Sequence, residues 1–330
     1  MLISLSIENA FSEPVKGIQY AERAERLADS LGFAKGQALA LKYIGMGYFV
    51  QGEYFKTINF WIESLEAFRK INDLDGESNI LNNIGAIYFN QGQYVKALDY
   101  YLESLKAAEK LGNKLRILTA LQNVGSIYSD SEITFDKALE YYRQALPLSI
   151  EVGNDMALGT ITVNIGQIYV NKEQYDSALF YFEKSLNAFR KVEGGNTPYT
   201  LNYMGKVYAL RNDFSKAIQY QQESYEIAKS RNAKLEMSHS LLGLAETYKL
   251  MGDEQAALAA LNEAEALATE INASYQLKDA YLSLSQVHAD LRDYKNAYQY
   301  RVLLDAVKDS IYNIEVNKKL ERAQFNYDLE

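Results

Sequence analysis

Amide side chains recur at one place in a repeating pattern of this 330-residue chain. Asn83, Asn123 and Asn164 are each followed by an aliphatic residue and then a glycine. An amide offers both a hydrogen-bond donor and an acceptor, which is what a peptide backbone needs from a surface that binds it without reading its sequence. The pattern therefore predicts a peptide-binding surface. Its predicted contacts are Asn79, Asn82, Asn83, Gln122, Asn123, Asn164, Gln167, Asn202, Lys206 and Tyr199.

The same asparagines also have a purely structural interpretation. Because Asn83, Asn123 and Asn164 stand directly before an apolar residue, their amides could bond a neighbouring helix end and hold a stack of helices together. In the binding interpretation, neighbouring helices roughly 10 Å apart match about three residues of an extended chain at ~3.3 Å each. Both interpretations use the same donors and acceptors, so the sequence leaves both open.

The segments that carry these amides repeat with a period of about 40 residues. A small residue falls at Gly45, Gly85, Gly125, Gly166, Gly205, Ala245 and Ser285, with spacings of 40, 40, 41, 39, 40 and 40. Three residues later comes a tyrosine in six units and His288 in the seventh, and a second small residue such as Ala97 follows further on. Small residues let two helices approach to roughly 8–10 Å. The period thus indicates one helix pair, repeated and stacked.

The periodic segments predict seven pairs of antiparallel helices joined by short turns. Gly52, Gly92 and Gly112 are among the glycines expected to end helices, where a left-handed residue is favoured. First helices are expected near 35–51, 75–91, 115–130, 155–171, 196–211, 235–251 and 275–291. Second helices are expected near 54–70, 94–111, 135–152, 174–192, 213–230, 253–270 and 293–309.

The small residue, the tyrosine three positions on, and an alanine and an aromatic residue such as Trp61 or Phe182 in the second helix resemble the tetratricopeptide repeat. The resemblance covers nearly the whole chain and implies an all-α fold, an α-α superhelical solenoid whose concave groove binds a peptide or protein. The period exceeds the family's usual length of about 34, as in kinesin light chain and bacterial peptide-sensing regulators. Residues 1–330 are expected to form a single solenoid, with a half repeat at 14–31, seven repeats at 35–309 and a capping or linker helix at 311–330.

The segment from Asp305 to Leu320, which includes Asp309-Ser310-Ile311, resembles the end of the repeat region in bacterial, especially Bacteroidetes-type, signalling proteins. In those proteins a similar segment leads to a membrane helix and then to a histidine kinase, nucleotide cyclase or DNA-binding domain. The resemblance implies that the chain is the sensor region of a larger receptor. It favours the periplasmic side of a membrane, with the cytoplasm as the alternative.

The composition argues against several classes of partner and chemistry. A net charge of −9 and a pI near 5.0 disfavour nucleic acid and anionic lipid, and no run of about 18 apolar residues is present that could insert into a membrane. The chain has no cysteine and lacks both the HExxH spacing and the Gly-x-Ser-x-Gly elbow. We therefore expect no cofactor, no metal site and no catalytic residue. Of the two histidines, His288 should pack in place of a tyrosine, and His239 should stand alone on the groove side.

These observations together predict a non-enzymatic module that binds a peptide or protein in its groove. The alternative is a structural scaffold that assembles other proteins through its outer side or its ends. Capture of a partner's C-terminal carboxylate is disfavoured, because Lys42, Lys206 and Lys249 lie in separate repeats.

Overall fold

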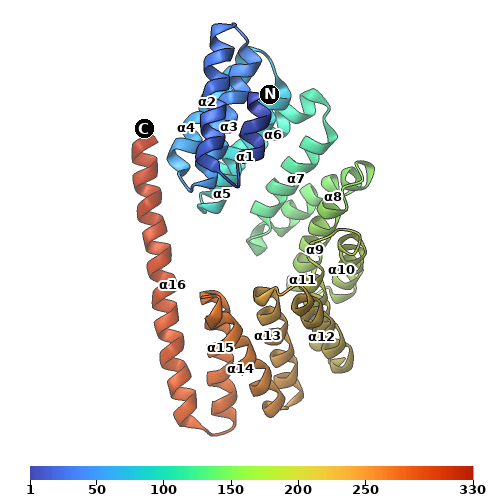
Figure 1. Ribbon diagram of the computed structural model, residues 1–330. Coiled ribbons are helices and arrows are strands. Elements are labelled where there is room, and N and C mark those ends of the chain that lie inside the picture. The colour runs from blue at the N-terminus through green and yellow to red at the C-terminus, as the bar shows by residue number, and fades with distance from the viewer. Residues whose placement is uncertain (330) are drawn as a thin grey trace. The chain divides into compact units, whose positions relative to one another are not determined.

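The computed structural model describes the backbone of residues 1–329 and the side chains of residues 1–312. Its described residues contain α-helices and one short 3-10 helix, and no strand (Figure 1). Consecutive helices pack in pairs, as the period of about 40 predicts. The fold is thus an all-α, tetratricopeptide-like solenoid. No helix in this part of the chain is both long and apolar enough to cross a membrane.

The helices fall into two compact units, which meet in the sequence between Val152 and Gly153. The first unit contains α1 (Leu2–Asn9), α2 (Pro14–Ser30), α3 (Ala34–Val50), α4 (Tyr54–Lys70), α5 (Leu74–Asn90), α6 (Tyr94–Leu111), α7 (Lys114–Tyr128), η1 (Glu132–Thr134) and α8 (Phe135–Glu151). The second unit contains α9 (Asp155–Asn171), α10 (Tyr175–Phe189), α11 (Thr197–Leu210), α12 (Phe214–Ser230), α13 (Lys234–Met251), α14 (Glu254–Glu270), α15 (Ser274–Asp290) and, as far as Glu321, α16 (Tyr294–Leu329). The expectation of one continuous solenoid over residues 1–330 stays a prediction.

Left-handed residues end helices throughout both units. Gly112 closes α6 with a φ of 72°, and Gly252 closes α13 with a φ of 77°. Where the sequence has no glycine, an asparagine often takes this conformation, as Asn72 and Asn232 do after α4 and α12. Asparagine tolerates the left-handed region better than most residues. These turns therefore need no proline to stop the helices.

In four repeats, a glycine at the small position makes room for a ring from the second helix. A Cβ atom added to Gly125 would lie 2.6 Å from Cε1 of Tyr142, and one added to Gly166 would lie 2.5 Å from Cε1 of Phe182. Both rings are fully buried. The contact expected between small residues is therefore mainly a contact between glycine and an aromatic face. Trp61 and Tyr101 occupy the same place against Gly45 and Gly85.

In five repeats, the tyrosine that follows the small residue stacks on a second aromatic ring. Tyr88 and Tyr100 lie 5.4 Å apart between ring centroids, with nearly parallel planes. Burial raises the pKa of Tyr88 to about 12. His288 is half-buried and stacks on Tyr300 at 5.5 Å, so its expected packing role is confirmed. The same stacking joins Tyr48 to Phe60, Tyr128 to Tyr141, Tyr169 to Tyr181 and Tyr208 to Tyr220.

The last helix differs from the second helices that precede it. Residues 311–329 are helical, as expected, but they continue α16 without a break, because no glycine or proline interrupts the segment. Arg301 and Asp305 on α16 form an exposed ion pair at 3.8 Å. The equivalent positions of α10 carry the buried residues Phe182 and Leu186. The expected role of residues 311–330 as a capping or linker helix depends on side chains outside those that the structure describes.

Candidate functional site

In the first unit, the predicted amides link one first helix to the next. Asn123 on α7 donates from Nδ2 to Oδ1 of Asn82 on α5 at 2.8 Å, and both side chains are half-buried. Asn79 lies one turn before Asn82, and its Oδ1 is buried with no hydrogen-bond partner among the described residues. Asn83 and Gln122 are half-buried on the same two helices. The predicted amides therefore lie on neighbouring helices. Some of their donors and acceptors are used in a hydrogen bond between those helices.

A charged group lies beside these amides. Arg116 on α7 binds both carboxylate oxygens of Asp75 on α5, at 2.9 and 3.1 Å. This hydrogen bonding lowers the pKa of Asp75. Burial, reinforced by the nearby Arg116, lowers the pKa of the half-buried Lys42 on α3. Arg116 and Lys42 thus both lie near the carboxylate of Asp75. The sequence did not predict this group.

In the second unit, Gln167 and Tyr199 make the equivalent link between first helices. Gln167 on α9 donates from Nε2 to the hydroxyl of Tyr199 on α11 at 3.0 Å. Tyr199 in turn donates to the hydroxyl of Tyr203 at 3.2 Å, and the two rings meet edge to face at 4.7 Å. Burial raises the pKa of Tyr203. Tyr199 is thus held in place by both of its neighbours, with its ring half-buried.

Asn202 and His239 extend this chain of contacts to α13 and α15. Asn202 donates from Nδ2 to the backbone carbonyl of His239 at 3.1 Å. The Nε2 atom of His239 lies 2.7 Å from Nε2 of Gln276 on α15. His239 is therefore not alone on this face, contrary to the sequence prediction, and burial lowers the pKa of its imidazole. Asn164 is half-buried on α9, and Lys206 is exposed on α11.

Gly243 makes the position of Asn202 sterically possible. A Cβ atom added to Gly243 would lie 2.2 Å from Oδ1 of Asn202. That oxygen is buried and accepts no hydrogen bond from the described residues. Gly243 stands two residues before the small Ala245, where earlier repeats carry Asn83, Asn123 and Asn164. A glycine at this amide position is the sequence signal that could have revealed the contact.

A cavity of about 220 Å³ opens beside Asn202, between the N-terminal halves of α11 and α13. Its lining residues are Asn196, Pro198, Tyr199, Asn202, Leu235, Glu236, His239 and Ser240. The sequence prediction included Tyr199 and Asn202 but missed the part that α13 supplies. Leu235 and Glu236 had no distinguishing pattern in the sequence.

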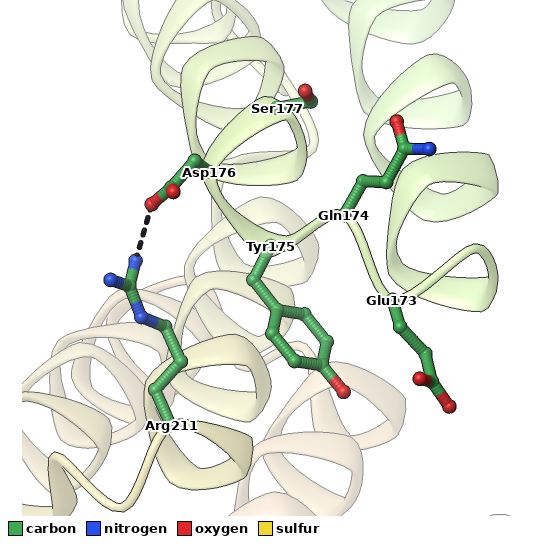
Figure 2. Close-up of a pocket in the computed structure, with 6 residues that line it drawn as sticks. All are labelled: Glu173, Gln174, Tyr175, Asp176, Ser177 and Arg211. Carbon is green, nitrogen blue, oxygen red and sulfur yellow. Dashed lines mark hydrogen bonds and ion pairs between the residues drawn. The ribbon is translucent and has the colours of Figure 1, made fainter.

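A second recess of about 380 Å³ lies at the turn before α10. Arg211, at the end of α11, binds Asp176 at 2.7 Å across this recess. Figure 2 shows these two side chains reaching toward one another, with Glu173, Gln174, Tyr175 and Ser177 around them. This ion pair links two successive repeats. Because the charge of Arg211 is compensated by Asp176, the described lining of the recess offers no free cation to an anionic ligand.

Comparison of the sequence with known protein families agrees with the paired helices of the structure. The model of the tetratricopeptide repeat matches residues 76–151 and 155–230. These two segments are tetratricopeptide repeats. Those two matches cover four successive helix pairs, α5 to α12. No curated protein matches the sequence.

Solved tetratricopeptide-like structures share this fold at low sequence identity. The apo quorum sensor NprR from B. thuringiensis is 17% identical with a TM-score of 0.71, and the match covers 90% of this chain and 83% of NprR. Apo RapI is 15% identical with a TM-score of 0.67, covering 84% of this chain and 99% of RapI. A Rap protein complexed with Competence and Sporulation Factor is 14% identical with a TM-score of 0.58, covering 94% of this chain and 98% of that protein.

The tetratricopeptide structure brings together only some of the predicted contacts. Four amides and one tyrosine of the prediction take part in bonds between neighbouring first helices, namely Asn82, Asn123, Gln167, Asn202 and Tyr199. These bonds fit the structural interpretation of the amides. Their part in binding a peptide stays a prediction.

Proposed function

We propose that this protein binds a peptide, or a flexible segment of a protein, along its first helices and acts without catalysis. One observation carries the proposal: half-buried amides recur on successive first helices, and those of Asn82 and Asn123 keep unused bonding groups. In the pair formed by Asn123 and Asn82, no described residue bonds Oδ1 of Asn123 or Nδ2 of Asn82. An acceptor and a donor therefore remain for a peptide backbone, at about 0.5–1.5 kcal/mol for each hydrogen bond.

The finer proposal is that the chain is the sensor region of a larger bacterial signalling protein. Its support is the resemblance of the segment after Asp305 to such receptors, and the shared fold of a quorum sensor and of a Rap protein complexed with Competence and Sporulation Factor. A receptor of this type would hold the chain on the periplasmic side of a membrane, with the cytoplasm as the alternative.

The second candidate function is a scaffold that assembles other proteins. The bonds between amides of successive helices favour it, because a side chain that holds the stack together needs no ligand. In that case a partner would bind through the outer side or the ends, and amide replacements would change stability without changing partner affinity.

Peptide selection followed by mutation separates these two functions. Peptides selected from a random library on the purified protein would be titrated into a triple variant, Asn83→Ala, Asn123→Ala and Asn164→Ala. We expect at least a tenfold loss of affinity with the helical circular dichroism retained. The matched control is Gln222→Ala with Asn262→Ala, which removes exposed amides from the second helices α12 and α14. Unchanged affinity in a folded triple variant would favour the scaffold.

A further inference from the structure

The cavity between α11 and α13 has the size of a single side chain. Its volume of about 220 Å³ is below the roughly 300–1,000 Å³ of pockets that hold a whole small molecule. Pro198 is buried in its wall, Tyr199 is half-buried, and Leu235 is 44% exposed. These residues give the cavity an apolar wall against which a hydrocarbon stem could pack.

The polar lining of the cavity includes a carboxylate and a buried amide oxygen, both of which accept hydrogen bonds. Glu236 supplies the one carboxylate that lines it, and no described residue forms an ion pair with that carboxylate. An ionised carboxylate only accepts hydrogen bonds. Two of the donors nearby are already used, since Tyr199 donates to Tyr203 and Asn202 donates to the carbonyl of His239, while the buried Oδ1 of Asn202 accepts no hydrogen bond from the described residues. The cavity therefore suits a ligand group that donates hydrogen bonds and carries positive charge.

We infer that this cavity binds one basic side chain, a lysine or an arginine, of the peptide ligand. The aliphatic stem packs on Pro198, Tyr199 and Leu235, and the cationic head meets Glu236. Long basic side chains bury their stems on apolar surface in this way while the head keeps a polar partner. The inference rests on the proposed function and names the chemistry of its ligand. The net charge of −9 favours the same kind of ligand at longer range.

A neighbouring cavity can hold a second side chain of the same ligand. It has a volume of about 390 Å³ and is lined by Leu235, Ile271, Tyr275 and Ile311, with the polar turn residues between them. Leu235 lines both cavities. Helices packed roughly 8–10 Å apart correspond to about three residues of extended chain at ~3.3 Å each. The ligand should therefore carry an apolar residue about three positions from its basic one.

Blocked single amino acids test the cavity directly. The probes are N-acetyl-arginine amide, N-acetyl-lysine amide and N-acetyl-norleucine amide, titrated into the full chain with the His239 ring resonances followed by NMR. We expect saturable shifts with arginine and lysine, and at least tenfold weaker binding of norleucine, because hydrogen bonds to charged groups are stronger than neutral ones. Equal binding of norleucine and arginine would overturn the inference.

Two variants make the result specific to Glu236. Glu236→Gln should weaken the arginine probe about tenfold, whereas Glu226→Gln, an exposed change of the same charge on α12, should leave it unchanged. Circular dichroism establishes that both variants are folded. An unchanged affinity in Glu236→Gln overturns the inference. If library-selected peptides bind with no preference for basic residues, the proposed function is retained and the inference of a basic side chain is wrong. If no peptide and no probe binds, both the proposed function and the inference are wrong.

Discussion

Asn123 and Asn82 form a hydrogen bond of 2.8 Å between α7 and α5, the first helices of two successive repeats. Both side chains lie on the helix face that the sequence assigns to ligand binding. One group of each amide joins the two repeats, while its other group has no hydrogen-bond partner among the described residues. Loss of binding in an amide variant must therefore be compared with its loss of stability.

Replacing Asn123 with alanine should lower the free energy of unfolding by about 1 kcal/mol, the typical net value of one hydrogen bond. The half-buried Oδ1 of Asn82 would lose its donor. Urea denaturation of Asn123→Ala, Asn82→Ala and the double variant measures the coupling between the two residues. If the two single effects simply add, the bond contributes nothing to stability.

Gly125 should not tolerate alanine. The added Cβ would lie 2.6 Å from the ring of Tyr142, which is fully buried. Overpacking of this kind costs about 1–3 kcal/mol, so thermal denaturation should show a clear drop in Tm for Gly125→Ala. The double variant with Tyr142→Leu, which removes the ring, should lose less than the two single losses together. A Gly125→Ala variant as stable as the natural chain would contradict the close packing of this glycine on the ring.

The helix pairs could be predicted from the sequence because their signals are local and periodic. A small residue, a tyrosine three positions later and left-handed turn residues such as Gly112 recur in each unit, and all of them act within one repeat. The continuity of α16 was missed because the repeat length suggested a boundary near residue 310, although nothing in the sequence breaks the helix there.

The candidate site was less predictable because its contacts join residues about 40 positions apart. The role of Asn202 depends on Gly243 and on the backbone of His239, neither of which its own repeat specifies. The burial of Ser224 was missed for a different reason. Serine is mostly an exposed residue, yet Ser224 is fully buried and bonds the carbonyl of Pro198 at 2.6 Å.

Gly243→Ala should displace Asn202 and break its bond to His239. The added Cβ would lie 2.2 Å from Oδ1 of Asn202, which is too close for any real contact. We expect the free energy of unfolding to fall by about 1–3 kcal/mol, measured by urea denaturation. Asn202→Ala should relieve the clash, so Gly243→Ala should cost less in the Asn202→Ala background than in the natural chain. An equal cost in both backgrounds would show that Asn202 is not the residue that needs the glycine.

His239 should make the protein less stable in mild acid. Burial lowers the pKa of its imidazole below the ordinary value of 6.5, although Glu236 on its own helix and Asp279 on α15 act in the opposite direction. The unfolded chain then binds a proton more readily than the folded chain, so this contribution to stability is full above about pH 6.5 and is lost as the pH falls toward the folded pKa.

The measurement is the free energy of unfolding from pH 7.5 to 5, with the His239→Gln variant as the control. Glutamine does not titrate, so the variant should lose less stability over this range than the natural chain, and NMR titration of the natural His239 ring should give a pKa below 6.5. His288 is held constant in both proteins and contributes equally to the two curves. Parallel curves for the two proteins, or a ring pKa above 6.5, would show that burial does not dominate the charge state of His239.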